Sequence, residues 1–217
     1  MSEIVRAMFF VDGFNLYHAI DKRPSYVPFK ERFQYHKYKW LDLNKLCRAF
    51  TTKNEVVDKI FYFTTYATWA PEKEKRHRIY VRALESVKVI PVFGKFKNKT
   101  IRCLADCNKK FSKPEEKQTD VNIAITILRE AFADTFDKAF IISGDSDLIP
   151  CIKAVKDLFP NKKIGIIMPP DRHTQELKDN SDFYMRIKEI QLKTSQFPDP
   201  ITDEQGNPIL QKPAEWA

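Results

Sequence analysis

The stretch that decides the fold is Phe140 to Pro150, with the sequence FIISGDSDLIP. Its first three residues are apolar, as expected of a short strand that is buried on both faces of a parallel sheet. A serine and a glycine then end the strand, and Asp145 and Asp147 place two carboxylates close together. Apolar residues at helical spacing follow from Leu148 to Leu158. The pattern therefore predicts strand, tight turn and helix, with both acids in the turn.

The two acids also have a purely structural interpretation. Asp147 or Ser146 can cap the following helix by accepting hydrogen bonds from its free N–H groups. A cap accounts for one acid, but two acids after a glycine exceed what a cap requires. The carboxyl ends of parallel strands form the ligand-binding edge of an open α/β sheet. Whether these acids form a site therefore depends on further carboxylates that reach the same edge from other segments.

The size and composition limit the class of protein. The 217 residues suffice for one domain with a full hydrophobic core. The sequence has no apolar run of about 18 residues, so no membrane span is expected, and its first residues lack a signal-peptide pattern. Four cysteines at irregular spacing predict reduced thiols and a cytoplasmic protein. The net charge of +8 favours a polyanionic partner.

Two more acids lie where elements begin or end. The apolar strand 6–11 is followed at once by DGFN, so Asp12 lies at the carboxyl end of a strand, with Asn15 near the start of a short helix. Taken alone, Asp12 is explained equally well as a turn residue before Gly13. The spacing of residues 117–132 predicts a largely buried helix with Asp120 at its amino end. An acid at that position is also a good helix cap.

Strand and helix patterns alternate along the whole chain. Further strands are expected at 56–66, 87–93, 163–168 and 184–190. This order predicts an α/β protein with a mainly parallel, Rossmann-like sheet and helices on both faces. Residues 1–190 form the expected domain, and no function is assigned to the proline-containing tail 191–217.

Two segments are rich in basic residues. Residues 94–117 predict a Lys-rich loop, in which Cys103 and Cys107 have zinc-ligand spacing without a second pair nearby. Residues 22–40 interleave basic and aromatic side chains, which can bind phosphates and stack on bases. Alternatively, these aromatic residues belong to the core and the charges are merely solvated. The expected substrate contacts here and after strand 163–168 are Lys30, Arg32, Lys37, Lys39, Arg172, His173 and Thr174.

The acids together predict a metal site. If the strands that end before Asp12 and Asp145 are neighbours, both carboxylates face one cleft, and Asp120 and Asp147 point to the same edge. Crowded carboxylates repel one another unless a cation lies between them. Oxygen ligands without nearby His or Cys favour Mg²⁺ or Mn²⁺ over zinc.

Three segments, VDGFN, KQTDVNIA and ISGDSDLIP, together resemble the NYN (LabA-like) domain family of the PIN-like ribonuclease superfamily, over about residues 5–190. The resemblance implies a Rossmann-like sheet, a Mg²⁺ or Mn²⁺ site and hydrolysis of RNA phosphodiester bonds. By motif position it implies Asp12, Asp120 and Asp145 as metal ligands, with Asp147 as a fourth catalytic acid. The supporting residues that we expect beside them are Asn15, Ser143 and Ser146.

The chain departs from the family at one place. Many relatives carry a further acid in the middle helix where this chain has Thr126. A weakly active or inactive RNA-binding module of the same fold is therefore the alternative to a ribonuclease. A phosphatase of the haloacid-dehalogenase kind is disfavoured, because it needs an acid two residues after its nucleophilic Asp and Phe14 stands there. Single-stranded RNA is the expected partner, and homodimer formation is left open.

Overall fold

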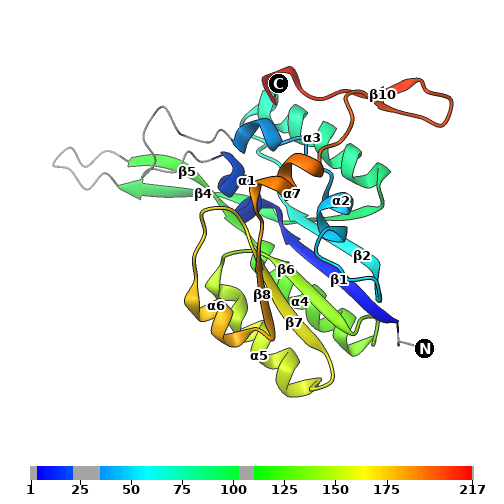
Figure 1. Cartoon of the computed structure of the whole chain (residues 1–217). Coiled ribbons are helices and arrows are strands. Elements are labelled where there is room, and N and C mark those ends of the chain that lie inside the picture. The colour runs from blue at the N-terminus through cyan, green and yellow to red at the C-terminus, as the bar shows by residue number, and fades with distance from the viewer. Residues whose placement is uncertain (1–3, 22–34, 103–109, 217) are drawn as a thin grey trace.

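The computed structural model describes residues 4–21, 35–102 and 110–216. Six parallel strands form the central sheet, in the order β3-β2-β1-β6-β7-β8 (Figure 1). The predicted α/β class with a parallel sheet is therefore confirmed. The strands are β1 (Val5–Asp12), β2 (Glu55–Thr64), β3 (Val89–Phe93), β6 (Lys138–Ile142), β7 (Lys163–Met168) and β8 (Phe183–Arg186).

Strand β1 lies inside the sheet and is buried on both faces. Its alternate side chains enter two separate hydrophobic clusters, with Phe9 in one and Phe10 in the other. Helices α1 (Gly13–Asp21), α2 (Leu43–Arg48), α3 (Pro71–Ser86) and α7 (Glu189–Thr194) pack in the first cluster. Helices α4 (Thr119–Phe132), α5 (Ile149–Leu158) and α6 (Gln175–Asn180) pack in the second. Helices thus cover both faces, as predicted.

Strands β1 and β6 are neighbours, with Val11 opposite Ile142. The strand order reverses at this pair, because β1 is followed by β2 on one side and β6 by β7 on the other. Such a switch point is where open parallel sheets place their ligand sites. It brings the residues that follow β1 and β6, including Asp12 and Asp145, to one edge of the sheet.

The predicted loop at 94–117 is wrong, because most of this segment is a β-hairpin. Strands β4 (Lys95–Arg102) and β5 (Lys110–Lys117) pair antiparallel as a ribbon that extends from the sheet (Figure 1). Their sequences, KFKNKTIR and KFSKPEEK, carry charged residues throughout and lack the one apolar face that reveals a strand. Cys103 and Cys107 lie outside the described residues, so the zinc alternative is not addressed by the structure.

The last predicted strand, 184–190, is shorter in the structure than expected. Strand β8 ends at Arg186, and α7 begins at Glu189. Beyond it the chain forms a small hairpin of β9 (Ile201–Thr202) and β10 (Pro208–Leu210) and then η3 (Ala214–Trp216). The Trp216 side chain is buried, with its ring centroid 6.4 Å from that of Trp40. The tail thus packs against the domain.

The basic-aromatic segment 22–40 is described only from residue 35 onward. Tyr38, at the end of η1 (Tyr35–Tyr38), and Trp40 are buried, so these two aromatic side chains belong to the core. The predicted substrate residues Lys30 and Arg32 lie outside the described residues. Among the helices that the structure describes, none is long and apolar enough to cross a membrane.

Candidate functional site

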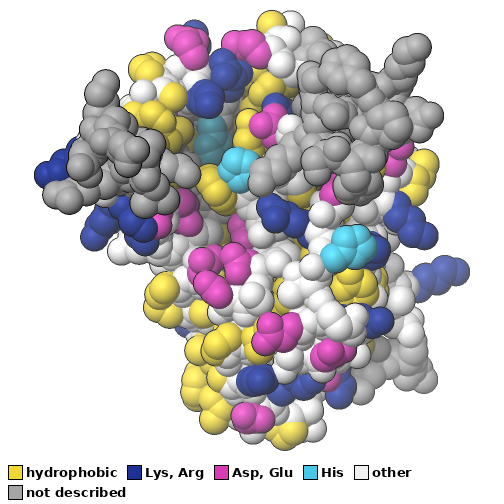
Figure 2. Space-filling view, turned by 90° about the vertical axis from the view of Figure 1, so that its left-hand side faces the viewer, with side chains coloured by type: hydrophobic (Ala, Val, Ile, Leu, Met, Phe, Trp, Pro, Cys, Tyr) yellow, Lys and Arg dark blue, Asp and Glu magenta, His cyan; other side chains and the backbone are white. Residues whose placement is uncertain are grey.

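A cleft of about 360 Å³ opens at the carboxyl edge of the sheet, beside the ends of β1 and β6. Figure 2 looks onto this edge, where acidic side chains lie near the centre of the face with histidine and basic side chains nearby. Four carboxylates converge on the cleft from β1, β5, α4 and the turn after β6. Its lining consists of Asp12, Phe14, Asn15, His18, Glu116, Asp120, Asp145 and Arg172.

Asp12 is the last residue of β1, and only 4% of it is exposed. Its Oδ1 accepts a hydrogen bond of 2.9 Å from the backbone N–H of Asn15, and its Oδ2 accepts one of 2.8 Å from the Ser143 hydroxyl. The fully buried Ser143 oxygen also accepts a hydrogen bond of 3.1 Å from the backbone N–H of Asp145. One serine therefore links the two acid-bearing turns.

The turn after β6 is held by side chains from two other segments. The Asn15 side-chain oxygen accepts a hydrogen bond of 3.1 Å from the N–H of Gly144, and the Thr174 hydroxyl donates one of 3.1 Å to its carbonyl oxygen. The start of α1 is equally constrained, because a Cβ on Gly13 would lie 2.6 Å from the carbonyl oxygen of Phe63. Glycine is therefore needed for α1 to begin directly against β2.

Asp120 lies in the first turn of α4 and is half-buried. Beside it, Glu116 accepts a hydrogen bond of 3.2 Å from the backbone N–H of Thr119, and a second from the Thr119 hydroxyl. Glu116 thereby caps α4 and also lines the cleft, and the sequence reasoning missed it. The available signal is an acid three residues before the first helical residue, but the loop predicted for 94–117 gives Glu116 no fixed position.

Negative charge is concentrated in the cleft, where four carboxylates lie beside one arginine, Arg172. Burial, followed by the charges of Asp120 and Asp145, raises the pKa of Asp12 to about 6, although its two hydrogen bonds oppose this shift. Burial also raises the pKa of Asp120 to about 6, aided by the charges of Asp145, Glu116 and Asp147. The hairpin lysines Lys99 and Lys117 form their ion pairs with Glu115 rather than with Glu116, which lines the cleft.

The predicted capping residue was wrong. Asp145, rather than Asp147 or Ser146, caps the short helix η2 (Ser146–Leu148), because its Oδ1 accepts a hydrogen bond of 3.0 Å from the N–H of Asp147. The Asp147 side chain is exposed and Ser146 is half-buried, and neither lines the cleft. Of the two acids in the turn, the structure thus brings Asp145 to the other carboxylates.

The predicted substrate residues are distributed around the edge. Arg172 lines the cleft itself, whereas the exposed His173 has Nδ1 2.7 Å from the Arg186 guanidinium. Lys37 is exposed on η1. Lys39 forms an ion pair with Asp21 and lines a second cavity next to the cleft. Of the predicted cations that the structure describes, Arg172 is the one that lines the cleft with the acids.

The acids are chemically suited to a hard cation, but they are not gathered around one point. Among the described side chains, no three of His, Cys, Asp or Glu form a group that could hold a metal ion as they stand. The donors in the cleft are carboxylate oxygens, which suit Mg²⁺ or Mn²⁺. The raised pKa values of Asp12 and Asp120 are of the kind that a bound cation would lower. Thr126 is buried within α4 and does not line the cleft.

Comparison with protein families matches residues 6–188 to the NYN domain. The chain therefore belongs to the NYN domain family, which has the PIN-like nuclease fold, and the resemblance noted in the sequence is confirmed.

Two individual proteins resemble the chain. The 6-hydroxy-3-succinoylpyridine 3-monooxygenase HspA of Pseudomonas putida (strain DSM 28022 / S16) is 23% identical over 202 residues. This match covers 77% of the present chain and 61% of that relative's length. A crystal structure of a protein of unknown function from Vibrio parahaemolyticus RIMD 2210633 superposes with a TM-score of 0.56 at 18% identity, covering 87% of this chain and 96% of that one. The latter likeness concerns the fold alone.

Proposed function

We propose that the cleft binds Mg²⁺ or Mn²⁺ and that the protein hydrolyses phosphodiester bonds of RNA. The observation that carries this proposal is the convergence of four carboxylates, Asp12, Glu116, Asp120 and Asp145, on one cleft beside an arginine. Carboxylates of an ordinary structural kind are neutralised by nearby cations, and crowded ones without such partners are costly. Membership of a nuclease-like family supports the same reading.

Each residue has a role that follows from its position. Asp12, Asp120 and Asp145 would hold the cation, which supplies a bound water of lowered pKa and stabilises negative charge that develops on a phosphate. Asn15 and Ser143 fix the two turns that carry Asp12 and Asp145. Arg172 is placed to bind a phosphate oxygen at the rim of the same cleft. The exposed Asp147 adds negative charge near Asp120.

The separation of the carboxylates has a consequence for the proposal. Because no three of the described acids form a ready metal group, the cation would have to draw the carboxylates together as it binds. Part of the binding free energy would therefore be used to reorganise side chains, so we expect a weaker cation site than one that is already assembled.

The test is cleavage of labelled single-stranded RNA with Mg²⁺ or Mn²⁺ by wild-type protein and by an identically purified Asp145→Asn variant. We expect chelator-sensitive cleavage by the wild type and a loss of at least roughly a hundredfold in the variant, as for removal of a residue that acts on a bound metal. The matched control is Asp157→Asn, which changes an exposed acid on α5, away from the cleft. Equal cleavage by wild type and Asp145→Asn would contradict the proposal.

An RNA-binding module without cleavage is the second candidate. Two features favour it: the open arrangement of the acids, and the buried Thr126 at the place where the family resemblance implies a further acid. It predicts that RNA binds with the same affinity to wild type and to Asp145→Asn, that neither cleaves, and that affinity falls steeply with salt.

A further inference from the structure

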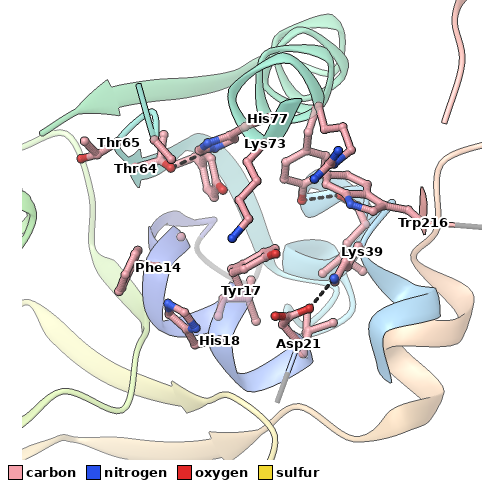
Figure 3. A pocket seen from close by; sticks show the side chains of 18 of the residues that line it. Phe14, Tyr17, His18, Asp21, Lys39, Thr64, Thr65, Lys73, His77 and Trp216 are labelled. Carbon is pink, nitrogen blue, oxygen red and sulfur yellow. Dashed lines mark hydrogen bonds and ion pairs between the residues drawn. The ribbon is translucent and has the colours of Figure 1, made fainter. Parts of the chain in front are cut away.

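A second cavity, of about 330 Å³, lies next to the acid cleft (Figure 3). The two cavities share Phe14 and His18, which lie on α1 directly after the acid-bearing end of β1. The remaining wall comes mainly from the end of β2, the loop that follows it with Trp69, α3 and the β4–β5 hairpin. Its volume lies in the range of sites for small molecules and cofactors. Whatever occupies this cavity therefore lies beside the acids.

Exposed aromatic side chains line the second cavity, and one of them, Phe14, also lines the acid cleft. Trp69 is 48% exposed and packs edge-on against Phe96 of the hairpin, with ring centroids 4.3 Å apart. Phe14 is 41% exposed, and its ring centroid lies 6.3 Å from that of Phe96. Large aromatic side chains that remain this exposed next to a cavity offer free faces on which a flat ring can stack. The rings form a continuous row from the acid cleft to the second cavity.

One cation points into the cavity. The Lys73 side chain on α3 extends toward the Tyr17 ring (Figure 3), and no described acid forms an ion pair with it. The two other cations of the lining differ, because Lys39 pairs with Asp21 and Arg76 pairs with Glu215 at 2.8 Å. Lys73 is thus the described cation of this lining that keeps its charge available to an anionic ligand.

The same cavity contains neutral polar groups. The His77 Nε2 lies 3.0 Å from the Thr64 hydroxyl, and burial lowers the pKa of His77 to about 4, so its ring is uncharged at neutral pH. The buried Thr65 hydroxyl has no hydrogen-bond partner among the described residues. A buried polar atom without a partner is unfavourable.

We propose that this cavity binds an unpaired base of the RNA substrate, stacked against Trp69, with Lys73 on the adjoining phosphate. Aromatic stacking combined with a cation is how single strands are held, and every base has a face that can stack. A base that is paired in a duplex cannot enter the cavity, so the proposal predicts a preference for single strands. It rests on the proposed function only in taking RNA as the substrate.

The test measures binding by the full chain in chelator, where cleavage does not interfere. Fluorescence anisotropy of a short labelled single-stranded RNA compares Trp69→Ala and Lys73→Gln with wild type. The matched controls are Phe132→Ala, an aromatic side chain that is 69% exposed on α4, and Lys153→Gln, an exposed lysine on α5. We expect Trp69→Ala to weaken binding about tenfold, as for loss of one stacked base, and Lys73→Gln to weaken it less. Neither control should change it.

An RNA series with one abasic position per molecule identifies the occupant. For one abasic RNA of the series, we expect binding to the wild type that is about tenfold weaker than that of intact RNA. For Trp69→Ala, the same abasic RNA and intact RNA should bind with equal affinity, because the stacking partner is already absent. The proposal is overturned if Trp69→Ala binds intact RNA like wild type, or if every abasic RNA affects both proteins equally. The latter result would indicate that Trp69 acts on folding or on a ligand other than a base.

Cleavage kinetics separate this inference from the proposed function. If the wild type cleaves RNA, Trp69→Ala should raise KM and leave kcat nearly unchanged, because it removes binding that substrate and transition state share. An unchanged KM would overturn the base site while the nuclease stands. If the wild type binds RNA without cleaving it and the abasic series behaves as expected, the base site stands and the nuclease proposal fails.

Discussion

Acidic residues at the amino edge of the central sheet form ion pairs with described cations, whereas two acids at the carboxyl edge, Asp12 and Asp120, do not. At the amino edge, Asp137 accepts a hydrogen bond of 2.7 Å from the backbone N–H of Arg6 and pairs with its guanidinium at 2.6 Å. There the buried Lys162 pairs with Asp134 at 2.5 Å. At the carboxyl edge, Asp12 and Asp120 have no such cationic partner among the described residues.

The pKa values record this difference. Hydrogen bonds from Arg6 and Lys162 hold the pKa values of Asp137 and Asp134 below their ordinary range, whereas burial and neighbouring acids raise those of Asp12 and Asp120 to about 6. Acids at the amino edge therefore stabilise the fold at neutral pH, and those at the carboxyl edge destabilise it. Among the described residues, the acids of the amino edge are held in ion pairs, whereas Asp12 and Asp120 are not, and this difference favours a site for an external cation.

The largest effect on stability is expected at the amino edge. Asp137→Ala leaves the Arg6 backbone N–H and guanidinium without their acceptor and should lower the free energy of unfolding by about 2 kcal/mol. Urea denaturation measures this loss, with Asp157→Ala as the control. The variant should still cleave RNA like wild type at a temperature where both are folded. A loss of cleavage in the folded variant would show that the two edges are not functionally distinct.

A smaller loss of stability is expected from the serine that links the two turns. Ser143→Ala removes the donor to Asp12 and the acceptor for the Asp145 N–H, which should cost about 1.5 kcal/mol and weaken cleavage. Ser146→Ala is the matched control, because that neighbouring hydroxyl makes no hydrogen bond within the described part of the chain. If both variants unfold at the same urea concentration as wild type, the hydrogen bonds of Ser143 contribute nothing to the stability of the fold.

The smallest expected change in the free energy of unfolding is a gain, from Asp120→Asn. Below pH 4, Asp120 is protonated in the folded and unfolded states, and between about pH 4 and 6 the unfolded state loses its proton first, so stability falls as pH rises. Asp120→Asn avoids this loss. Because the side chain is only half-buried, solvent screening reduces the gain to about 1 kcal/mol at pH 7 without divalent cations, and it should vanish at pH 3.5.

Thermal unfolding of Asp120→Asn and wild type at both pH values, in chelator, measures this difference. The control is Asp157→Asn, whose melting temperature should follow that of wild type. A variant that is less stable than wild type at pH 7 would mean that Asp120 is compensated in the folded protein, and the contrast between the two edges would not hold.

The sequence predicted those parts of the site that depend on local patterns. The apolar runs before DGFN and GDSD defined two buried strands, and their acids at the strand ends follow directly from that assignment. The prediction that Asp12 and Asp145 face one cleft required their strands to be neighbours, and β1 does pair with β6. The family resemblance implied that Asp120 is a site residue. The apolar spacing of the helix also predicts its position at the start of α4.

The remainder depends on contacts between distant segments. Glu116 reaches the cleft because 94–117 is a hairpin, and the charged faces of that ribbon give no strand pattern. The hydrogen bond from Gly144 to Asn15 joins residues that are 129 positions apart, and no local rule anticipates it. The second cavity likewise combines α1, α3 and the hairpin, and no local pattern indicates that these elements meet.

The central claim is that the acid cleft holds a divalent cation, and calorimetric titration of Mn²⁺ into the full chain at pH 7 tests it most directly. The account predicts saturable binding to the wild type, binding lost in Asp145→Asn and weakened in Asp120→Asn, and unchanged binding in Asp157→Asn. Bound Mn²⁺ should also raise the melting temperature of wild type, because it binds the folded state alone. Binding that is equal in wild type and Asp145→Asn, or absent from the wild type, would contradict the account.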